Sequence, residues 1–474
     1  MAADPTNDAP SPPRPRRAPV LLRAERSLIE ESNLFVAVLW LALPVLAEQL
    51  LAMAVGLSDQ LITGHYFEQV HLAAINLMVY VLWLLNSLFV VVSIGATAMT
   101  ARFVGAGDWL QARRVTNQAF VLGAALALLL TLSGLAWGRH LVGLMQLEGP
   151  SAELAVRYLS WLLPALPMIM CESVGIACLR GAGDMMSGLY IMVVVNLTNI
   201  AVSWSLALGL GPMPEMGWDG LALGTAVGHC LGGVLVVARL AAPRTQLRLS
   251  PRLLRPDIDL LGRLLRIGVP GGADVTSILV CQFWFVAIIN RLGDLAAAAH
   301  GVAIRIESLS YSPGFAFQVA AATLAGQYLG ARNYRRASRS VLLACLLGGG
   351  IMTAAAALFF FGADWLTGLM VSPQRHDVAQ VAAPLLRIVA IGIPPFALTM
   401  ILTGALRGAG DTRWPLVFTW IGYLGVRIPG AYLLAHVMGW GVAGAWYAMV
   451  ADLMIRCVLV VYRFLHGGWM RVEV

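Results

Sequence analysis

Three carboxylate side chains in the first half of the sequence interrupt long apolar runs. Glu48 and Asp59 lie in the run from 34 to 63, and Glu172 lies in the run from 154 to 178. An ionised side chain near the centre of a bilayer costs about 2.5 to 3.5 kcal/mol on insertion scales, so it needs a partner or a function. These runs hold no arginine at a similar depth. We interpret the three carboxylates as groups that bind a proton or another cation reversibly.

The second half also places carboxylates in apolar runs, but arginines accompany them. Opposite charges of this kind are predicted to neutralise one another within the half. The first half is therefore the better candidate for a cation site. The predicted network of the second half contains Asp274, Glu307 and Asp452 together with Arg305, Arg387 and Arg427.

Helical spacing brings polar side chains of the first half to compatible depths. Asp59 follows Glu48 by eleven residues, about three turns, so the two share a helix face and differ by about 16 Å in depth. With the N-terminus inside the cell, Asp59 belongs to the outer half of its helix. Asn199 and Ser203 share a face at i and i+4 in the outer half of another helix, and Thr225 stands early in an inward-running one.

The elements that position these groups are long apolar helices. The 474-residue chain is 59% hydrophobic and only 12% charged, which excludes a soluble domain of this size. Runs of about 20 apolar residues are long enough to cross the hydrocarbon core of a bilayer. Twelve such segments are predicted, at 34–63, 76–101, 115–138, 154–178, 186–210, 218–240, 260–290, 296–325, 338–362, 380–405, 414–437 and 441–463.

The chain contains an internal duplication. The hexamer Leu-Arg-Gly-Ala-Gly-Asp occurs at 179–184 and again at 406–411. Because six helices return the chain to its starting side, the two repeats are parallel and enclose a central cavity, as is typical of transporters. The predicted fold is therefore an all-α polytopic membrane protein, with twelve transmembrane helices in two six-helix lobes.

Other duplicated positions leave alternatives open. Glu48 and Asp274 each follow a proline by four residues, so both could bond backbone groups that the prolines free instead of contacting a substrate. Glu172 has no acidic counterpart, because Thr399 stands at its place in the second half. That asymmetry favours a functional role for Glu172, in substrate binding or as a secondary acidic group.

The hexamers lie between apolar runs, so their glycines are predicted to form tight turns on the cytosolic side. Their charged residues are predicted to pair with each other or to bind helix ends, Arg180 with Asp184 and Arg407 with Asp411. The expected role of these residues is structural or gating.

All 32 basic residues are arginines, and they gather in alternate loops. The positive-inside rule then places those loops and both termini in the cytoplasm, in a multi-pass protein of the cytoplasmic (inner) membrane. This arrangement accounts for the net charge of +7 without a nucleic-acid partner. The predicted divisions are a flexible cytosolic tail at 1–32, an N-lobe at 33–240, a cytosolic linker at 241–259, a C-lobe at 260–465 and a cytosolic tail at 466–474.

Motifs spread over almost the whole chain after the N-terminal tail carry a family resemblance. They are Leu43-Pro44, Asp59 before Gly64-His65, Gly217-Trp218-Asp219-Gly220, Gly326-Gln327 before Gly330-Ala331, and both hexamers. In their order and spacing they resemble the multidrug and toxic compound extrusion (MATE) family. The resemblance implies a secondary active antiporter that exports organic cations, drugs or toxic metabolites in exchange for H⁺ or Na⁺ by alternating access.

The resemblance also implies a cation-coupling site. In the DinF-like branch the site consists of an aspartate, an Asn-x-x-x-Asp pair and a threonine, which here match Asp59, Asn199 and Thr225. Ser203 replaces the second aspartate. A single carboxylate favours H⁺, with Na⁺ at Asp59 as the alternative coupling ion, and no cofactor is expected. The NorM-like branch has acidic residues where this chain has Ile278 and Phe396, so a sodium site of that type is not expected.

A transporter of a different substrate is the main alternative function. Arg305, Arg387 and Arg427 could line a path for an anionic pyrophosphate head group, because arginine binds phosphate bidentately. Flippases for lipid-linked substrates in the same superfamily have this task. The sequence leaves the substrate and the oligomeric state open.

An enzyme is the remote alternative. Gly-Ala-Gly-Asp resembles the Gly-x-Gly-Asp signature of intramembrane aspartyl proteases, but the Tyr-Asp partner motif of those enzymes is absent. The chain also lacks lysine and a phosphate-binding loop. We therefore expect a transporter in the lipid bilayer that an ion gradient or another subunit drives.

Overall fold

The computed structural model describes residues 33–144, 149–243, 245–372 and 375–474, and these residues form helices without any strand. The predicted tail at 1–32 lies outside the described residues. The first half contains α1 (Leu34–Tyr66), α2 (Gln69–Gly105), α3 (Trp109–Leu144), α4 (Pro150–Leu162), α5 (Leu166–Gly181), α6 (Met185–Leu208) and α7 (Trp218–Ala241).

The second half begins after a connection at 242–257. Its helices are α8 (Ile258–Asn290), α9 (Asp294–Ser308), α10 (Tyr311–Gly330), α11 (Tyr334–Phe361), α12 (Ala363–Met370), α13 (His376–Gly408), α14 (Arg413–Trp420), α15 (Ile428–Tyr432) and α16 (Gly441–His466). The π-helical stretch Ile421–Arg427 joins α14 to α15, and a second one, Leu433–Val437, continues α15.

All twelve predicted segments are helical, and ten helices in the described part of the chain are long and apolar enough to cross a membrane. Two segments are divided. The fourth is interrupted by a 3-10 turn at Leu163–Ala165 that contains Pro164, since proline cannot donate a helical hydrogen bond. The eighth breaks between α9 and α10, just before Pro313. The short helix α12 was not predicted.

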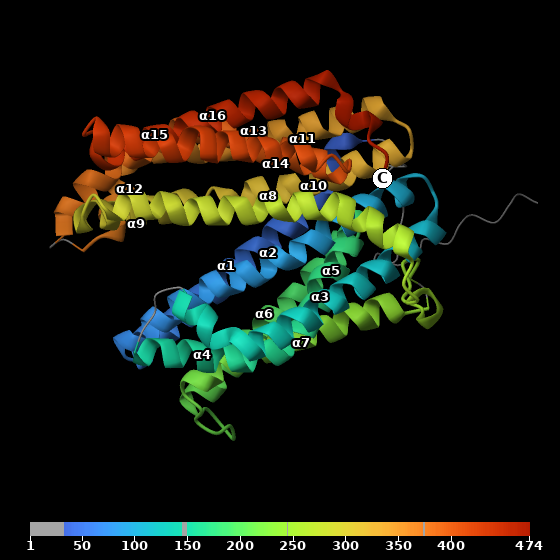
Figure 1. Cartoon of the computed structure of the whole chain (residues 1–474), viewed down its shortest axis with the longest axis horizontal. Coiled ribbons are helices and arrows are strands. Elements are labelled where there is room, and N and C mark those ends of the chain that lie inside the picture. The colour runs from blue at the N-terminus through green and yellow to red at the C-terminus, as the bar shows by residue number, and fades with distance from the viewer. Residues whose placement is uncertain (1–32, 145–148, 244, 373–374) are drawn as a thin grey trace, which may run out of the picture.

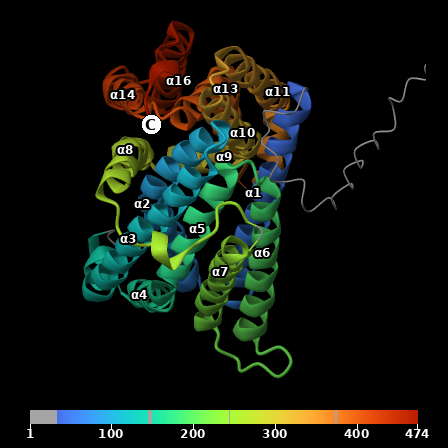
Figure 2. The same ribbon diagram turned by 90° about the vertical axis from the view of Figure 1, so that its right-hand side faces the viewer.

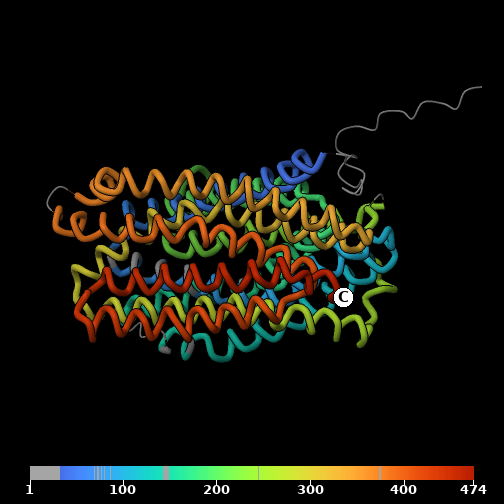
Figure 3. Tube along the Cα trace, turned by 90° about the horizontal axis from the view of Figure 1, so that it is seen from above, coloured from blue at the N-terminus to red at the C-terminus, as the bar shows by residue number. Residues whose placement is uncertain are grey.

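The helices form two bundles, one from each half of the chain (Figure 1). The bundles meet at the end that carries residues 242–257 and the C-terminus, here called the linker end, and they diverge toward the opposite far end. Seen from above, the helices run along the long axis of the molecule (Figure 3). The fold is therefore the predicted pair of helical lobes.

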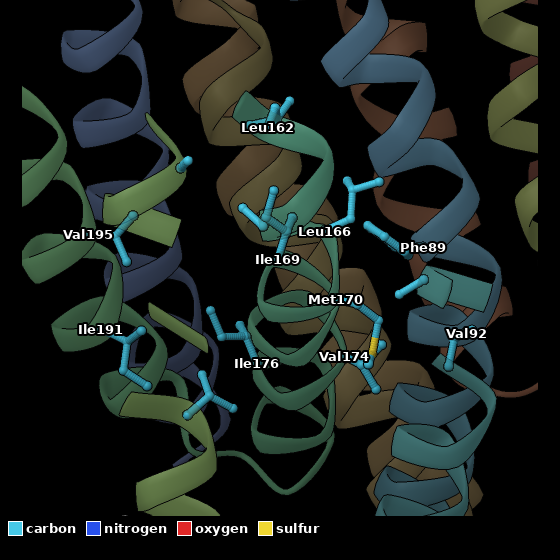
Figure 4. Packing of buried hydrophobic residues seen from close by; sticks show 14 of the residues in the cluster. Phe89, Val92, Leu162, Leu166, Ile169, Met170, Val174, Ile176, Ile191 and Val195 are labelled. Atoms are coloured by element: carbon cyan, nitrogen blue, oxygen red, sulfur yellow. The ribbon is translucent and has the colours of Figure 1, made fainter. Parts of the chain in front are cut away.

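The first helix belongs to both halves. Near the linker end, its residues Ala37 to Val45 share a buried cluster with α10, α11 and α13, and farther along it packs against α6. Figure 2 shows α1 running from beside α11 to beside α6. The core of the first half gathers around α5, whose Ile169 and Ile176 lie between α2 and α6 (Figure 4).

Glycines join the two halves backbone to backbone at the linker end. A Cβ at Gly105 would lie 2.0 Å from the carbonyl oxygen of Gln327, and one at Gly330 would lie 2.0 Å from that of Arg102. Gln327 Nε2 donates to the Gly181 carbonyl over 3.0 Å. Close approach of this kind requires residues without a side chain. The contact is therefore specific to one relative position of the lobes.

The C-terminal residues reinforce this contact. Trp469 is fully buried and stacks on Phe464, while the carbonyl of Val472 accepts a hydrogen bond from Arg102 Nη2 of α2 over 2.7 Å. Part of the segment 466–474, predicted as a tail, is therefore packed against both halves.

We predict that Gly330→Ala separates the lobes at the linker end, because the new methyl group overlaps the Arg102 carbonyl. Overpacking of this kind costs about 1 to 3 kcal/mol. Spin labels on cysteines placed at the exposed positions Asp108 and Arg335 should report longer distances in the variant. Gly262→Ala is the matched control, since a Cβ there meets no atom within 4 Å. Equal distance distributions in the two variants would contradict the prediction.

Candidate functional site

A glycine stripe holds α6 tightly against α7. A Cβ at Gly224 would lie 2.1 Å from Ser203 Oγ, and one at Gly228 would lie 3.2 Å from the Cβ of Asn199. Small residues at every fourth position let helix backbones approach closely in a membrane. The polar side chains of α6 are therefore pressed onto α7. The stripe consists of Gly220, Gly224, Gly228 and Gly232.

Three buried side chains from α4, α6 and α7 meet at this interface. Asn199 Nδ2 donates to Thr225 Oγ1 over 3.2 Å, and the Tyr158 hydroxyl lies 3.0 Å from the same oxygen. Thr225 gives its own proton to the Leu221 carbonyl, so Tyr158 is the donor to Thr225. The predicted pair of Asn199 and Thr225 is thus in direct contact.

Asp59 lies beside this cluster on α1. Its carboxylate interacts electrostatically with Tyr158, and the neighbouring Ser58 accepts a hydrogen bond from Trp204 Nε1 of α6 over 2.9 Å. Asp59 Oδ1 is buried and has no hydrogen-bond partner among the described residues. A buried oxygen without a partner is costly, and a proton or a cation bound there would remove the cost.

The other predicted site residues also present free oxygens. Asn199 Oδ1 and Ser203 Oγ are buried without partners in the part of the chain that the structure describes. The site thus offers one carboxylate and several neutral oxygens. Within the same residues no group of three His, Cys, Asp or Glu side chains could hold a metal ion. A proton needs only the one basic oxygen of Asp59, whereas Na⁺ takes several oxygen ligands and would use the neutral oxygens as well.

Glu48 and Asp274 are each paired with the arginine of a hexamer. Arg180 Nη2 donates to Glu48 Oε1 over 2.8 Å, and Arg407 Nη2 donates to Asp274 Oδ2 over 2.6 Å. The prediction that Glu48 has no arginine at its depth is therefore wrong, as is the pairing of Asp274 with Arg305, Arg387 or Arg427. Each arginine reaches from the end of its helix toward the carboxylate of the first helix in its own half.

The hexamer aspartates have other partners. Asp184 accepts from the Ser187 amide at the start of α6 and pairs with Arg239 of α7 over 3.0 Å. Asp411 pairs with Arg463 of α16 over 2.9 Å. The predicted pairs within each hexamer do not form, whereas the predicted tight turns do.

Those turns depend on glycine. Gly183 and Gly410 have φ angles of 90° and 87°, in the region that residues with side chains rarely adopt. Each hexamer thus connects four helices of its half, two through the turn and two through ion pairs.

The predicted network of the second half forms only in part. Asp452 is fully buried, and its carboxylate accepts hydrogen bonds from Arg427 Nε over 2.8 Å and from Arg456 Nε over 2.7 Å. The contact of Arg427 with Asp452 confirms that part of the prediction. Both arginines also lie over the ring of Tyr423, at 4.3 and 4.7 Å from its centroid.

The other residues of the predicted charge network do not contact Asp452. Glu307 accepts from the Tyr311 hydroxyl over 2.8 Å. Arg387 pairs with the exposed Asp364, and Arg305 is exposed. Because Arg305, Arg387 and Arg427 share no partner, the structure gives no support to a common anion path along them.

Glu172 has a partner that the sequence reasoning missed. His229 Nδ1 lies 3.0 Å from Glu172 Oε2. His229 stands four residues after Thr225, so the two share a face of α7. The repeated glycines of α7 are the sequence signal that could have identified this face. Tyr158 was also missed, because no local pattern marks it. Arg456 was missed too, although its position four residues after Asp452 could have identified the pair.

Comparisons with known proteins agree with this architecture. A protein-family model named MatE matches residues 44–205 and 273–433. The sequence is 29% identical over 438 residues to a probable multidrug resistance protein NorM of Thermotoga maritima, which covers 90% of this chain and 92% of that protein. It is 30% identical over 362 residues to a protein of the same description from Idiomarina loihiensis, covering 74% and 77%.

A solved structure shares the fold. It is described as the outward-facing conformation of a multidrug resistance MATE family transporter of the MOP superfamily. Its TM-score is 0.87 at 22% sequence identity, and the match covers 94% of this chain and 99% of that chain. The arrangement of helices is thus common to both proteins.

We predict that Arg407→Gln destabilises the protein by about 3 to 5 kcal/mol, because Asp274, only 1% exposed, loses its partner. The double variant with Asp274→Asn should recover much of the loss, since no buried charge remains. Arg387→Gln is the control, because its partner Asp364 is 76% exposed and exposed pairs contribute about 0 to 1 kcal/mol. Apparent melting temperatures in detergent measure the effects, and equal losses for the two single variants would contradict the assignment.

Proposed function

Because the chain belongs to the MatE family, we propose that it is a multidrug efflux transporter. It works as a secondary active antiporter that exports organic cations, drugs or toxic metabolites. The names of its NorM relatives support this function, since those from Thermotoga maritima and Idiomarina loihiensis are described as probable multidrug resistance proteins. It is a transporter and not an enzyme, and it needs no cofactor besides the coupling ion.

The coupling ion in this proposal is H⁺, and the observation that carries it is the free oxygen of Asp59. Asp59 supplies the one carboxylate beside Asn199, Ser203 and Thr225, and its Oδ1 has no partner among the residues described. Protonation turns that oxygen into a hydroxyl and removes the charge from the membrane interior. Na⁺ at the same position is the alternative, and it would have to rely on neutral oxygens for its other ligands.

The transport cycle follows from the way the lobes meet. They are joined at the linker end by glycine contacts and diverge at the far end (Figure 1). Asp59 lies seven residues before the end of α1, about 10 Å from the far end of that helix. We propose that in this state Asp59 exchanges its proton with the side of the membrane that the far end faces. A change in the protonation of Asp59 would then favour separation of the lobes at the linker end.

The direction of transport depends on the orientation in the membrane. The arginine-rich loops gather at the linker end, and the positive-inside rule assigns this end to the cytoplasm. In the proposed topology both termini are cytosolic, the chain spans the inner membrane, and the far end faces outward. Protons enter from the far end and the exported cation leaves there.

Reconstitution in liposomes tests the proposal. A pH gradient alone should drive uptake of the cationic dye ethidium, and a Na⁺ gradient alone should not. Asp59→Asn should reduce the uptake driven by the pH gradient by about tenfold or more, because the one carboxylate of the described cluster is lost. Asp364→Asn is the control, since this carboxylate is exposed. Uptake driven by Na⁺ alone, or unchanged coupling in Asp59→Asn, would contradict the assignment.

Ser203 offers a test in the opposite direction. Ser203→Asp introduces the second aspartate that the DinF-like pattern contains, on the turn of α6 that faces Gly224. Two carboxylates bind Na⁺ better than one, because they supply more negative oxygen ligands. Ethidium transport by this variant should therefore respond to a Na⁺ gradient. If Na⁺ has no effect on the variant, Ser203 does not determine the choice of ion.

A further inference from the structure

A second titratable pair lies one helical turn from the Asp59 cluster. His229 follows Thr225 by four residues on the same face of α7, about 6 Å closer to the linker end. Its Nδ1 is 3.0 Å from Glu172 Oε2 of α5. The His229 side chain is 31% exposed and that of Glu172 is only 6% exposed. An accessible imidazole thus contacts a buried carboxylate.

The fold makes space for this pair. A Cβ at Gly232 would lie 2.5 Å from Glu172 Oε2 and 2.6 Å from Val195 Cγ2. The carboxylate therefore lies where α5, α6 and α7 meet, and only glycine at 232 leaves room for it. The next residue of α6, Asn196, has a buried Nδ2 without a partner in the described residues. Asn196 is three residues from Asn199, so polar groups continue toward the linker end on α6 as well as on α7.

Glu48 lies one step farther along the same interior. The Cβ position of Gly188 on α6 is 4.0 Å from Glu48 Oε2 and 3.4 Å from Ile176 Cγ2. Ile176 follows Glu172 by four residues, about 6 Å along α5 toward the linker end. Glu48 Oε1 is bound by Arg180, but Oε2 is buried and has no partner among the residues that the structure includes.

We propose that His229 and Glu172 form a proton relay between Asp59 and the linker end, with Glu48 as the next acceptor. The inference rests on the proposed H⁺ coupling at Asp59. A proton that Asp59 releases binds His229 Nε2, while the proton on Nδ1 passes to the Glu172 carboxylate. Glu172 then gives a proton to Glu48 Oε2 and returns to its ionised form. His229, now protonated on Nε2 instead of Nδ1, and Glu172 end with their original charges, and one proton has moved from Asp59 to Glu48.

Few other titratable groups face the pair. Cys230 of α7 interacts electrostatically with Glu172, and Cys171 adjoins Glu172 on α5. From α4 comes Tyr158, which is bonded to Thr225. The other titratable residues of α4, Glu153 and Arg157, lie nearer the far end, where Arg157 pairs with Asp219. The titratable residue of α6, Tyr190, is exposed. On α1, Glu48 with its partner Arg180 lies farther toward the linker end.

The second half shows that the fold does not require this pair. Thr399 occupies the position of Glu172 there, and its hydroxyl donates to the Pro395 carbonyl of its own helix over 2.8 Å. The same helical architecture is thus built without a carboxylate. A buried acid present in one repeat alone points to a task in proton movement, not in folding.

Uptake of ethidium into proteoliposomes, driven by a pH gradient, tests the relay. Glu172→Gln and His229→Gln should each slow the initial rate by about tenfold or more, because a positioned proton carrier is lost. Ethidium binding in detergent, and the number of protons released on binding, should stay unchanged because Asp59 is intact. Glu172→Asp should retain most of the rate, and Thr399→Val is the control at the equivalent position.

Chemical rescue separates a relay from a structural role. Added imidazole should restore the rate of His229→Gln, because the site of the missing side chain is partly accessible. Rates and pH profiles like those of the unmodified protein, or a slow rate that imidazole does not restore, would overturn the relay. If Asp59→Asn remains fully coupled, the proposed function itself fails. If Asp59→Asn is uncoupled and both relay variants transport normally, the relay alone fails.

Discussion

The high cost of a charge in hydrocarbon governs the arrangement of polar groups in this protein. Arginines neutralise the buried carboxylates Glu48, Asp274 and Asp452. Asp59 differs from these three, because among the described residues it has neither an arginine partner nor a hydrogen-bond partner for its buried Oδ1. Glu172 and Glu307 are also buried without an arginine, but His229 and Tyr311 contact them. A charge that the fold leaves unpaired is one that an external proton or cation can neutralise.

The duplicated hexamers apply this rule twice. In each half the arginine neutralises a carboxylate on the first helix, and the aspartate pairs with an arginine on the last helix. Each hexamer therefore connects four helices near the linker end, two through its turn and two through its ion pairs. The same end holds the glycine contacts between the lobes. Structural pairing and lobe contact are thus concentrated where the two halves meet, and the unpaired carboxylate lies toward the other end.

Symmetry between the halves separates structural from functional groups. Glu48 and Asp274 have matching arginine partners, so these two salt bridges belong to the shared architecture, and the proposed relay uses only the second oxygen of Glu48. Asp59 and Glu172 have no acidic equivalents in the second half. The first half also has the α7 glycine stripe, which presses Asn199 and Ser203 onto α7. Close helix contact and an unpaired acid together create a site that the second half lacks.

The sequence by itself determined the twelve helical segments, the duplication, and the common depth of Asp59, Asn199 and Thr225. Hydropathy and helical rise are local properties, so they do not depend on what the helices pack against. The partners of the charges were decided by the tertiary structure alone. Arg180 finds Glu48 across 132 residues and Arg407 finds Asp274 across 133. Which of several arginines reaches a carboxylate depends on how helices are rotated and how closely they approach, and only the packed structure fixes those quantities.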